Sequence, residues 1–572
     1  MRKLIWLTAV FLLPLSVCHA QLTAEPPTLV SAPIPPGTVD AVSGKSAVAP
    51  NFDAIVFSSR MSNLVAGDTN KAEDIFLSEN GVNSLITRSE TGAQANSDSF
   101  DPAISAKLTD GSYAIAYAST ATNLLRGYSA PTTGSCAAAG CSQVFLTLMP
   151  SGASVLVSRG RDANGPLPLA GGSGSSKQPS VAILSATNNK ILVSFLSDAP
   201  NLAVGSSAGL PKISPFLATI LVVDGIPVVD TVETINPPPD ADCFDLILSG
   251  DGSYGAMSTA ATNVVPGSPG NGFRQIVLFN YASHLSIHLS KNSAGELGNG
   301  DSTLPSFSYR GDVRGFVTTA TNLIYGVGGL RSPVFVLHSK SSGGLAQINT
   351  SSAGVPSDGA VGDGRLSANG FYAAFSDTAS NLAGLTGNFA KQTYMKNLLS
   401  GELVLLSKNV AGEAGSRNSY DIFLGAAGFT SLDAIASFTT FAFNLVGDAG
   451  SFLPVLRSDI TIPPPPLVAG VEISAPPDIT VAKRSATVDL QKFSLVGTTG
   501  QEAHASAARV TYNVEIRKTG VRGAIVRTTS RNRITVRRLS PSRYTVRYRV
   551  TGSGPSGTIK SKYSPKGAMV IQ

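Results

Sequence analysis

A short phrase repeated seven times constrains the fold of this chain more than any other feature. Its clearest copies are Tyr-Ala-Ser-Thr-Ala-Thr-Asn-Leu-Leu at Tyr117–Leu125 and Val-Thr-Thr-Ala-Thr-Asn-Leu at Val317–Leu323. Each copy contains one asparagine, and successive asparagines are 60, 78, 62, 59, 59 and 63 residues apart. The seven are Asn63, Asn123, Asn201, Asn263, Asn322, Asn381 and Asn444. Such a period predicts an array of equal structural units, each in contact with its neighbours.

Each unit holds four short strand-like runs separated by turn signals. In the second unit these runs are Pro102–Ser105, Tyr113–Ser119, Gln143–Leu146 and Ser154–Ser158. Four strands in each of seven units predict a β-propeller, because radial repetition covers the sheet faces and leaves only short edges. The last unit lacks a clear fourth strand, so we expect Thr28–Ser31 to complete the seventh blade.

The phrasing of the first unit also resembles a known family. Asn63–Asn70, followed by Asp74-Ile75-Phe76, is similar to the repeats of TolB-like and WD-repeat propellers, particularly the exported bacterial type. The resemblance covers residues 27–460 and implies a seven-bladed β-propeller. It implies no activity, since such propellers host many functions.

The N-terminus predicts export. Residues 1–20 read as a signal peptide, with basic Arg2 and Lys3, the apolar run Leu4–Leu15 and a cleavage site after Ala20. The alternative is a lipoprotein box ending at Cys18, although Val17 departs from that motif. No later stretch is long and apolar enough to be a transmembrane segment. The expected location is therefore the periplasm, the outer surface or the extracellular medium.

The C-terminal part has a different composition. A proline-rich linker is predicted at 461–478, followed by a basic β-sandwich at 479–572 whose Leu539-x-Pro541-x-x-Tyr544 resembles the fibronectin type III corner. The predicted fold class is thus all-β, a seven-bladed β-propeller followed by a small β-sandwich. Residues 470–572 carry 18 Lys and Arg against 5 Asp and Glu, whereas the whole chain is only +6.

Three arginines of this tail, Arg543, Arg547 and Arg549, are expected on one strand face. They form either a solvated face or a basic patch for an anionic surface such as lipopolysaccharide or an acidic glycan. Export and the lack of an interleaved aromatic platform argue against nucleic acid as a partner.

Three cysteines remain after the predicted cleavage. Cys136 and Cys141 flank Ala-Ala-Ala-Gly in a loop, where an exported protein favours a local disulfide over two free thiols. Cys243 is then unpaired and is expected to be buried as a small hydrophobic residue.

Motifs of catalysis and metal binding give no catalytic, cofactor-binding or metal-ligating residue. Gly205–Gly209 matches G-x-S-x-G but has no helical pattern behind it. His284 and His288 are expected on one strand face, about 13 Å apart, which is too far to share a metal. Arg310–Asp312 spells a cell-adhesion tripeptide at a predicted turn.

The first unit offers four oxygen-bearing side chains that could hold calcium or serve a turn. They are Asp68, Asn70, Glu73 and Asp74. The repeated asparagines are expected to satisfy backbone groups of loops, as Asn does in turns.

These observations favour an exported, non-enzymatic binding or scaffold protein that recognises an envelope protein or a glycan. The alternative is a polysaccharide hydrolase or lyase with paired carboxylates at the propeller funnel. Two carboxyl groups in a pocket on the axis would favour the enzyme, and a funnel lined by Ser, Thr and Ala would favour the binder. The binding face is expected beside blade 2, whose loops Arg126–Ser142 and Arg159–Lys177 are long and open on the same face.

Overall fold

The structure is a computed structural model in which the chain divides into a unit spanning Leu22–Thr461 and a second unit built from the strands after Thr461. In the first unit the described residues are 22–34, 41–108, 110–131, 136, 140–162, 165–185, 190–202, 213–234, 238–324, 332–340, 344–383, 390–426, 433–446 and 454–461. In the second they are 468–472, 478–482, 485–489, 494–497, 509–519, 525–529, 533–537, 542–554, 557–560 and 567–571. The predicted signal peptide, the G-x-S-x-G match and most of the predicted linker lie outside these residues.

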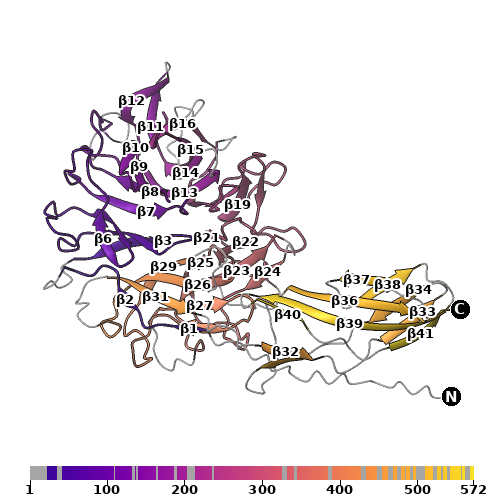
Figure 1. The fold of residues 1–572 in the computed structure, drawn as a ribbon. Coiled ribbons are helices and arrows are strands. Elements are labelled where there is room, and N and C mark those ends of the chain that lie inside the picture. Colours follow the sequence, from indigo (N-terminus) through magenta and orange to yellow (C-terminus); the bar gives the residue numbers. More distant parts are fainter. Residues whose placement is uncertain are drawn as a thin grey trace. The chain divides into compact units, whose positions relative to one another are not determined.

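The first unit is a seven-bladed β-propeller, as the repeat predicts, and its blades are antiparallel sheets arranged about one axis (Figure 1). Six blades have four strands, and the seventh has five because two short N-terminal strands join it. Blade 1 holds β3 (Ser43–Val48), β4 (Ala54–Ser59), β5 (Asp74–Glu79) and β6 (Val82–Leu85). Blade 2 holds β7 (Ser99–Ile104), β8 (Tyr113–Ser119), β9 (Gln143–Met149) and β10 (Ala153–Leu156). Blade 3 holds β13 (Ser176–Ser185), β14 (Lys190–Ser197), β15 (Ser214–Val223) and β16 (Ile226–Thr234).

The next three blades follow the same order from the axis outwards. Blade 4 holds β17 (Cys243–Leu248), β18 (Tyr254–Thr259), β19 (Gln275–Asn280) and β20 (Ser286–His288). Blade 5 holds β21 (Ser302–Phe307), β22 (Val313–Thr318), β23 (Val334–Ser339) and β24 (Leu345–Gln347). Blade 6 holds β25 (Val361–Leu366), β26 (Tyr372–Asp377), β27 (Gln392–Asn397) and β28 (Leu403–Leu405).

Blade 7 joins the two ends of the propeller. Its strands β29 (Ser419–Ala426), β30 (Ala434–Thr440) and β31 (Val455–Thr461) are completed by β1 (Thr23–Ala24) and β2 (Thr28–Leu29), which both pair with β31. Beyond β2, the amide of Val30 donates to the Val455 carbonyl at 2.9 Å. The prediction that Thr28–Ser31 closes the ring is confirmed, and β1 adds a second segment to the same edge.

The core lies between adjacent blades. Between blades 7 and 1, for example, Ile435 and Val455 share a cluster with Ile55 and Phe57. Similar clusters join blade 1 to blade 2, blade 2 to blade 3, blade 3 to blade 4, blade 4 to blade 5 and blade 5 to blade 6. They form because both faces of the middle strands are apolar, which buries every residue of β4 and β8. Each blade therefore depends on its neighbours for a dry face, as expected of a repeat array.

The repeated asparagine fastens two loops of its own blade together. Asn322 donates from Nδ2 to the Leu297 carbonyl and accepts from the Asn299 amide, both at 2.9 Å. Four other copies make the same pair of bonds with the loop that leads into their blade: Asn123, Asn263, Asn381 and Asn444. The predicted backbone-satisfying role is confirmed for these copies, and Asn201 likewise accepts from the Ser173 amide.

Two expectations were wrong. The predicted loop Arg159–Lys177 contains a hairpin, β11 (Arg159–Asp162) with β12 (Gly165–Gly171), which its Gly, Pro and Ser content had concealed. His284 does not share a strand with His288, because it lies in the turn before β20 with a φ of 54° and its amide bonds to the Asn280 carbonyl.

The described residues of the second unit form three antiparallel sheets (Figure 1). The sheets are β32 (Val468–Glu472) with β35 (Ser494–Gly497); β33 (Asp478–Ala482), β34 (Ser485–Asp489) and β38 (Arg533–Arg537); and β36 (Arg509–Lys518), β37 (Ile525–Thr529), β39 (Ser542–Gly554), β40 (Gly557–Lys560) and β41 (Gly567–Ile571). Val514, Ile516 and Val546 are fully buried or nearly so. The fibronectin-like sandwich and the domain boundaries stay predictions.

Candidate functional site

Every inner strand of the propeller carries a β-bulge at the same position. The pairing of each inner strand with its neighbour shifts register there, for example between Phe100 and Ala103 in blade 2. Five residues at the bulge have a φ between 51° and 53°, namely Asp101, Gln178, Asp245, Leu304 and Asp421. A bulge locally re-aims a side chain, and a positive φ is costly for a residue with a Cβ, so repetition of this conformation marks a specified feature.

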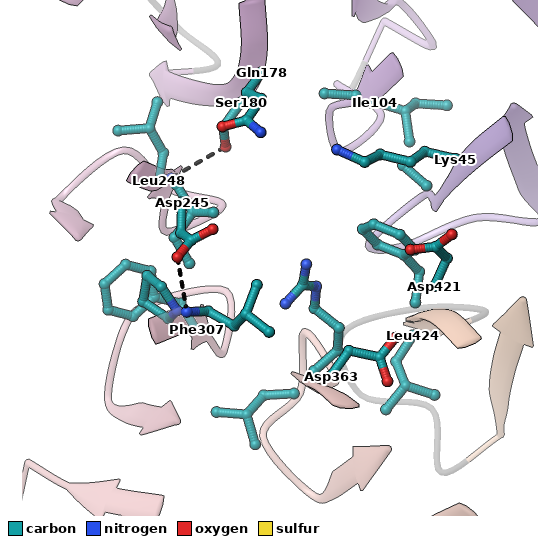
Figure 2. Close-up of a pocket in the computed structure, with 18 of the residues that line it drawn as sticks. Lys45, Ile104, Gln178, Ser180, Asp245, Leu248, Phe307, Asp363, Asp421 and Leu424 are labelled. Carbon is teal, nitrogen blue, oxygen red and sulfur yellow. Dashed lines mark hydrogen bonds between the residues drawn. The ribbon is translucent and has the colours of Figure 1, made fainter. Parts of the chain in front are cut away.

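The seven bulge residues form a ring around a cavity of about 540 Å³ on the propeller axis. We call them the bulge ring: Lys45, Asp101, Gln178, Asp245, Leu304, Asp363 and Asp421. Figure 2 shows Lys45, Asp245 and Asp363 from three different blades facing this space. Apolar side chains further along the inner strands, such as Ile104, Leu248 and Phe307, complete the lining. The size is typical of ligand pockets.

Three of the four carboxylates in the bulge ring fasten one blade to the next. Asp101 accepts from the Gln178 amide at 3.2 Å and from Lys45 Nζ at 2.9 Å. Asp245 accepts from the Leu304 amide at 3.2 Å and from the Ser258 hydroxyl at 2.8 Å. In the same way, Asp363 accepts from the Ile422 amide at 3.0 Å and from the Ser376 amide at 3.1 Å. Blades 2, 4 and 6 are thus each linked to the following blade.

Asp421 differs from the other three carboxylates. Burial raises its pKa, and the charge of Asp363 raises it further, while Lys45 and Arg365 act in the opposite direction. Its closest described donor is the Thr439 hydroxyl at 3.5 Å, a long contact. Asp421 is therefore the axial carboxyl that the scaffold satisfies least.

This ring of acids was not predicted from the sequence. Ser and Ala do line the funnel, as the binding hypothesis expected, at Ala47, Ala103, Ser180, Ala368 and Ser376. Four aspartates line it as well, which is the arrangement expected of the enzyme alternative. Each of the four aspartates is the third residue of its inner strand, as in Ser99-Phe100-Asp101 and Ser419-Tyr420-Asp421. The signal appears only when the seven units are aligned on their asparagines.

The two insertions of blade 2 form one structure, which we call the blade 2 platform: the described residues of 126–142 and the hairpin β11–β12. Ser129 joins the two parts through its amide, which donates to the Leu169 carbonyl at 3.0 Å, and through a parallel bridge to Ala170. Arg161 anchors the hairpin to blade 3 by donating its amide to the Asn201 carbonyl at 2.7 Å.

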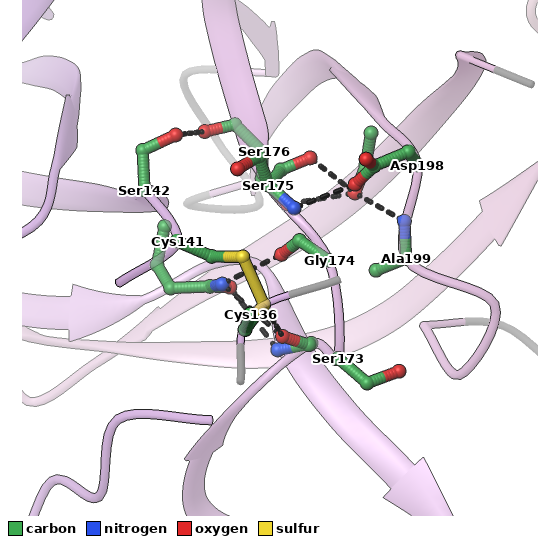
Figure 3. The surroundings of a disulfide bond; sticks show 12 residues. Cys136, Cys141, Ser142, Ser173, Gly174, Ser175, Ser176, Asp198 and Ala199 are labelled. Atoms are coloured by element: carbon green, nitrogen blue, oxygen red, sulfur yellow. Dashed lines mark hydrogen bonds between the residues drawn. A yellow bond between two sulfur atoms is a disulfide. The ribbon is translucent and has the colours of Figure 1, made fainter. Parts of the chain in front are cut away.

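A disulfide lies at the base of this platform. Cys136 and Cys141 are joined in the structure with their Cα atoms 5.0 Å apart, and both are buried (Figure 3). The neighbouring Gln143 side chain donates to the carbonyls of Gly172 and Gly174 and accepts from the Gly172 amide. These bonds tie the base of the platform to β9, so the platform is held from below by the blade itself.

The candidate calcium ligands are used by the fold. The two carboxylate oxygens of Asp74 accept from the Thr87 hydroxyl at 2.6 Å and from Asn70 Nδ2 at 2.7 Å. Asn70 thus presents a donor, not an oxygen, while Glu73 lies 3.8 Å from the guanidinium of Arg60. Burial raises the pKa of Asp74 to about 6. Within the part of the chain that the structure describes, no group of three or more His, Cys, Asp or Glu is placed to hold a metal ion.

The remaining motif residues are structural. His288 is buried with Nε2 2.9 Å from the Ser268 carbonyl oxygen, and burial lowers its pKa. Cys243 is fully buried with its pKa raised to about 12 by burial, which confirms its expected hydrophobic role. Arg310–Asp312 forms the turn between β21 and β22, as predicted, with Gly311 at a φ of 66°.

One arginine of the predicted basic patch is engaged within its own sheet. Arg547 of β39 lies opposite Glu515 of β36, and its guanidinium is 3.0 Å from that buried carboxylate. Arg543 and Arg549 occupy the same strand with the same parity, but their side chains lie outside the described residues. Part of the charge at Arg547 is consequently neutralised before any ligand arrives.

Comparison with known proteins does not assign this chain to a family. No family model and no curated protein matches this chain. A solved structure described as TolB from Agrobacterium tumefaciens is 11% identical, with a TM-score of 0.27, over 58% of this chain and 89% of its own. The extracellular domain of a hybrid two-component system from B. thetaiotaomicron is 8% identical, with a TM-score of 0.31, over 94% of this chain and 59% of its own. A mitotic checkpoint complex chain is 8% identical, with a TM-score of 0.34, over 76% and 96%.

With identities this low, none of these likenesses assigns a function. The class of protein follows from the sheet topology alone, which defines a seven-bladed β-propeller closed by its N-terminal strands. Among the described residues there is no helix of the length and hydropathy needed to cross a bilayer.

Proposed function

We propose that this chain is an exported, non-enzymatic binding or scaffold protein that recognises an envelope protein or a glycan through one face of its propeller. The observation that carries the proposal is the blade 2 platform. Two insertions that are separate in sequence are hydrogen-bonded to each other through Ser129, and the hairpin is anchored to blade 3 through Arg161. Pre-ordered loops on a rigid scaffold lower the entropic cost of binding a partner.

The state of the axial carboxylates supports binding over hydrolysis. A glycoside hydrolase needs one protonated and one ionised carboxyl group facing a common bond. Asp101, Asp245 and Asp363 instead accept hydrogen bonds from backbone amides of the following blade, which gives these carboxylates a structural role. Three of the four axial carboxylates therefore have a structural use in joining the blades, which favours a binding protein over a hydrolase.

The experiment is capture of envelope components from the organism that makes the protein. The test variant removes the tip of the hairpin, residues 161–169, and replaces Cys136 and Cys141 by Ser. The matched control is Leu399→Ser, which changes a side chain that is 68% exposed in the turn between β27 and β28 on the opposite propeller face. Thermal melting establishes that each variant is folded.

The proposal predicts that the wild-type protein and Leu399→Ser retain the same component and that the platform variant loses it. A folded platform variant that retains every component would move the binding site away from blade 2. A wild-type protein that retains no component would contradict the binding role itself.

A further inference from the structure

The loop of blade 7 that carries the repeated asparagine departs from the pattern of the other blades. Three residues before the asparagine, blades 2, 5 and 6 place a threonine: Thr120, Thr319 and Thr378. One residue before it, five blades place a hydroxyl: Ser62, Thr122, Thr262, Thr321 and Ser380. Blade 7 has phenylalanine at both positions, Phe441 and Phe443. The internal repeat therefore supplies its own reference for what the scaffold requires.

The hydroxyls in the other blades have a structural task. Thr120 and Thr319 donate to the carbonyls of Asp98 and Asp301, and Thr378 accepts from the Ala360 amide. Ser380 donates to Asp358 at 2.6 Å, and Thr321 accepts from Asn299 at 2.9 Å. Phenylalanine can make none of these bonds. Blade 7 therefore lacks these side-chain hydrogen bonds at the two positions. The phenylalanines do not add to the hydrophobic core in exchange, because Phe441 and Phe443 are 37% and 45% exposed.

The Phe441 ring is connected to the axial cavity through Tyr420, and Phe443 lies two residues further along the same loop. The Phe441 ring meets Tyr420 edge to face, with ring centroids 5.7 Å apart, and Tyr420 lines the cavity directly beside Asp421 of the bulge ring. The guanidinium of Arg417 covers Phe443 at 4.4 Å from the ring centroid, which holds that ring in place. We call Tyr420, Phe441 and Phe443 the blade 7 aromatic cluster.

The cavity beside this cluster carries charges of both signs in nearly equal number. Its cations are Lys45, Arg365 and Lys391, and its carboxylates are Asp101, Asp245, Asp363 and Asp421. The Lys391 ammonium group lies over Gly362 of the inner strand of blade 6, where a Cβ on that glycine would be only 2.5 Å from Nζ. A nearly balanced lining exerts little net attraction on a strongly charged ligand. It offers many hydrogen-bond donors and acceptors to a neutral one.

We propose that the blade 7 aromatic cluster and the adjoining mouth of the axial cavity form a binding site for a neutral oligosaccharide. A pyranose ring has an apolar face of C–H groups, which stacks on an exposed aromatic ring, and a rim of hydroxyls, which pairs with charged side chains. Phe441 and Phe443 supply the stacking surface, and Lys391 and Asp421 supply polar partners at the mouth. The inference rests on the proposed function for the class of partner and adds the site and the charge of the ligand.

The test is calorimetric titration of the whole protein with neutral hexasaccharides of glucose, xylose, mannose and N-acetylglucosamine, and with hexagalacturonate as the anionic comparison. The first variant, Phe441→Thr with Phe443→Thr, copies blades 2 and 5 and is therefore compatible with the fold. The second, Phe441→Leu with Phe443→Leu, retains apolar bulk but removes the aromatic faces. Phe273→Thr removes another exposed phenylalanine from the corresponding loop of blade 4, 43% exposed, as the matched control.

We expect at least one neutral hexasaccharide to bind the wild-type protein and Phe273→Thr equally. Both double variants should bind it about tenfold or more weakly, since two aromatic contacts are lost. Absence of binding by all four neutral sugars would overturn the inference, as would binding of hexagalacturonate alone. Unchanged affinity in the double variants would also overturn it. The proposed function is tested separately by envelope capture. If capture requires the blade 2 platform but is unchanged in the two double variants, the proposed function holds and the sugar site at blade 7 is wrong.

Discussion

Closure of the ring by the N-terminal strand can be tested with one buried side chain. Val30 follows β2, is 7% exposed and belongs to the cluster that joins blade 7 to blade 1. Replacing Val30 by Ala removes two methyl groups, each worth about 0.8 kcal/mol of burial, and leaves a small cavity. The expected loss in the free energy of unfolding is about 2 kcal/mol. Val82→Ala on β6, where the side chain is 69% exposed, is the control and should change stability by less than about 0.5 kcal/mol.

A deletion extends the same test. The deletion removes residues 22–34, which contain β1 and β2. A longer deletion, such as 21–45, would also remove the first residues of β3 in blade 1 and would not test closure alone. Without residues 22–34, the edge of β31 loses its partner strands, and the apparent midpoint of urea or thermal unfolding should fall sharply. The assay is urea unfolding followed by far-UV circular dichroism. Equal midpoints for Val30→Ala and Val82→Ala, or unchanged melting of the shortened protein, would refute the closure argument.

Three further predictions concern single features. Burial raises the pKa of Asp74 to about 6, which is above its value in the unfolded chain, so the folded state binds a proton more tightly. The free energy of unfolding should therefore fall by up to about 3 kcal/mol as the pH rises from 4 through 6, and then level off. Asp74→Asn should flatten this dependence, and parallel pH profiles for both proteins would exclude Asp74 as the cause. Asn322→Ala removes two hydrogen bonds to partly exposed loop groups and should lower the free energy of urea unfolding by about 1–2 kcal/mol. Asn322→Asp retains the acceptor and should lose less stability. Equal stability of Asn322→Ala and the wild-type protein would contradict the role of this asparagine in joining the two loops. Residues 470–572 should fold alone and bind anionic vesicles with an affinity that falls steeply with salt and with Arg543→Ser and Arg549→Ser, and salt-independent binding would contradict the electrostatic basis.

The architecture was predictable because its signals are local and repeated. Each asparagine clamps a loop of its own blade, so the same short phrase is required wherever that loop occurs, as at Asn322 and Asn381. The closing strand was also predictable, since a repeat that ends one strand short needs a partner from the other end of the chain.

The axial site was not predictable from local patterns. Asp101 and Asp363 act through amides of the next blade, and their carboxylates reach the axis only because each inner strand bulges. The hairpin β11–β12 was hidden by Gly, Pro and Ser, residues that ordinarily mark loops. Phe441 and Phe443 became informative only when the bonds made by the equivalent hydroxyls in other blades were known.

The most direct test of the central claim asks whether the protein holds its partner without changing it. The wild-type protein and the double variant Asp363→Asn with Asp421→Asn are incubated with the envelope glycans of the producing organism, and retained glycan and newly formed reducing ends are measured together. Hydrolases and lyases both create reducing ends, whereas a binding protein creates none. We expect retention by the wild-type protein with no new reducing ends. New reducing ends that form with the wild-type protein and disappear with the double variant would contradict it and assign the axial carboxylates to catalysis.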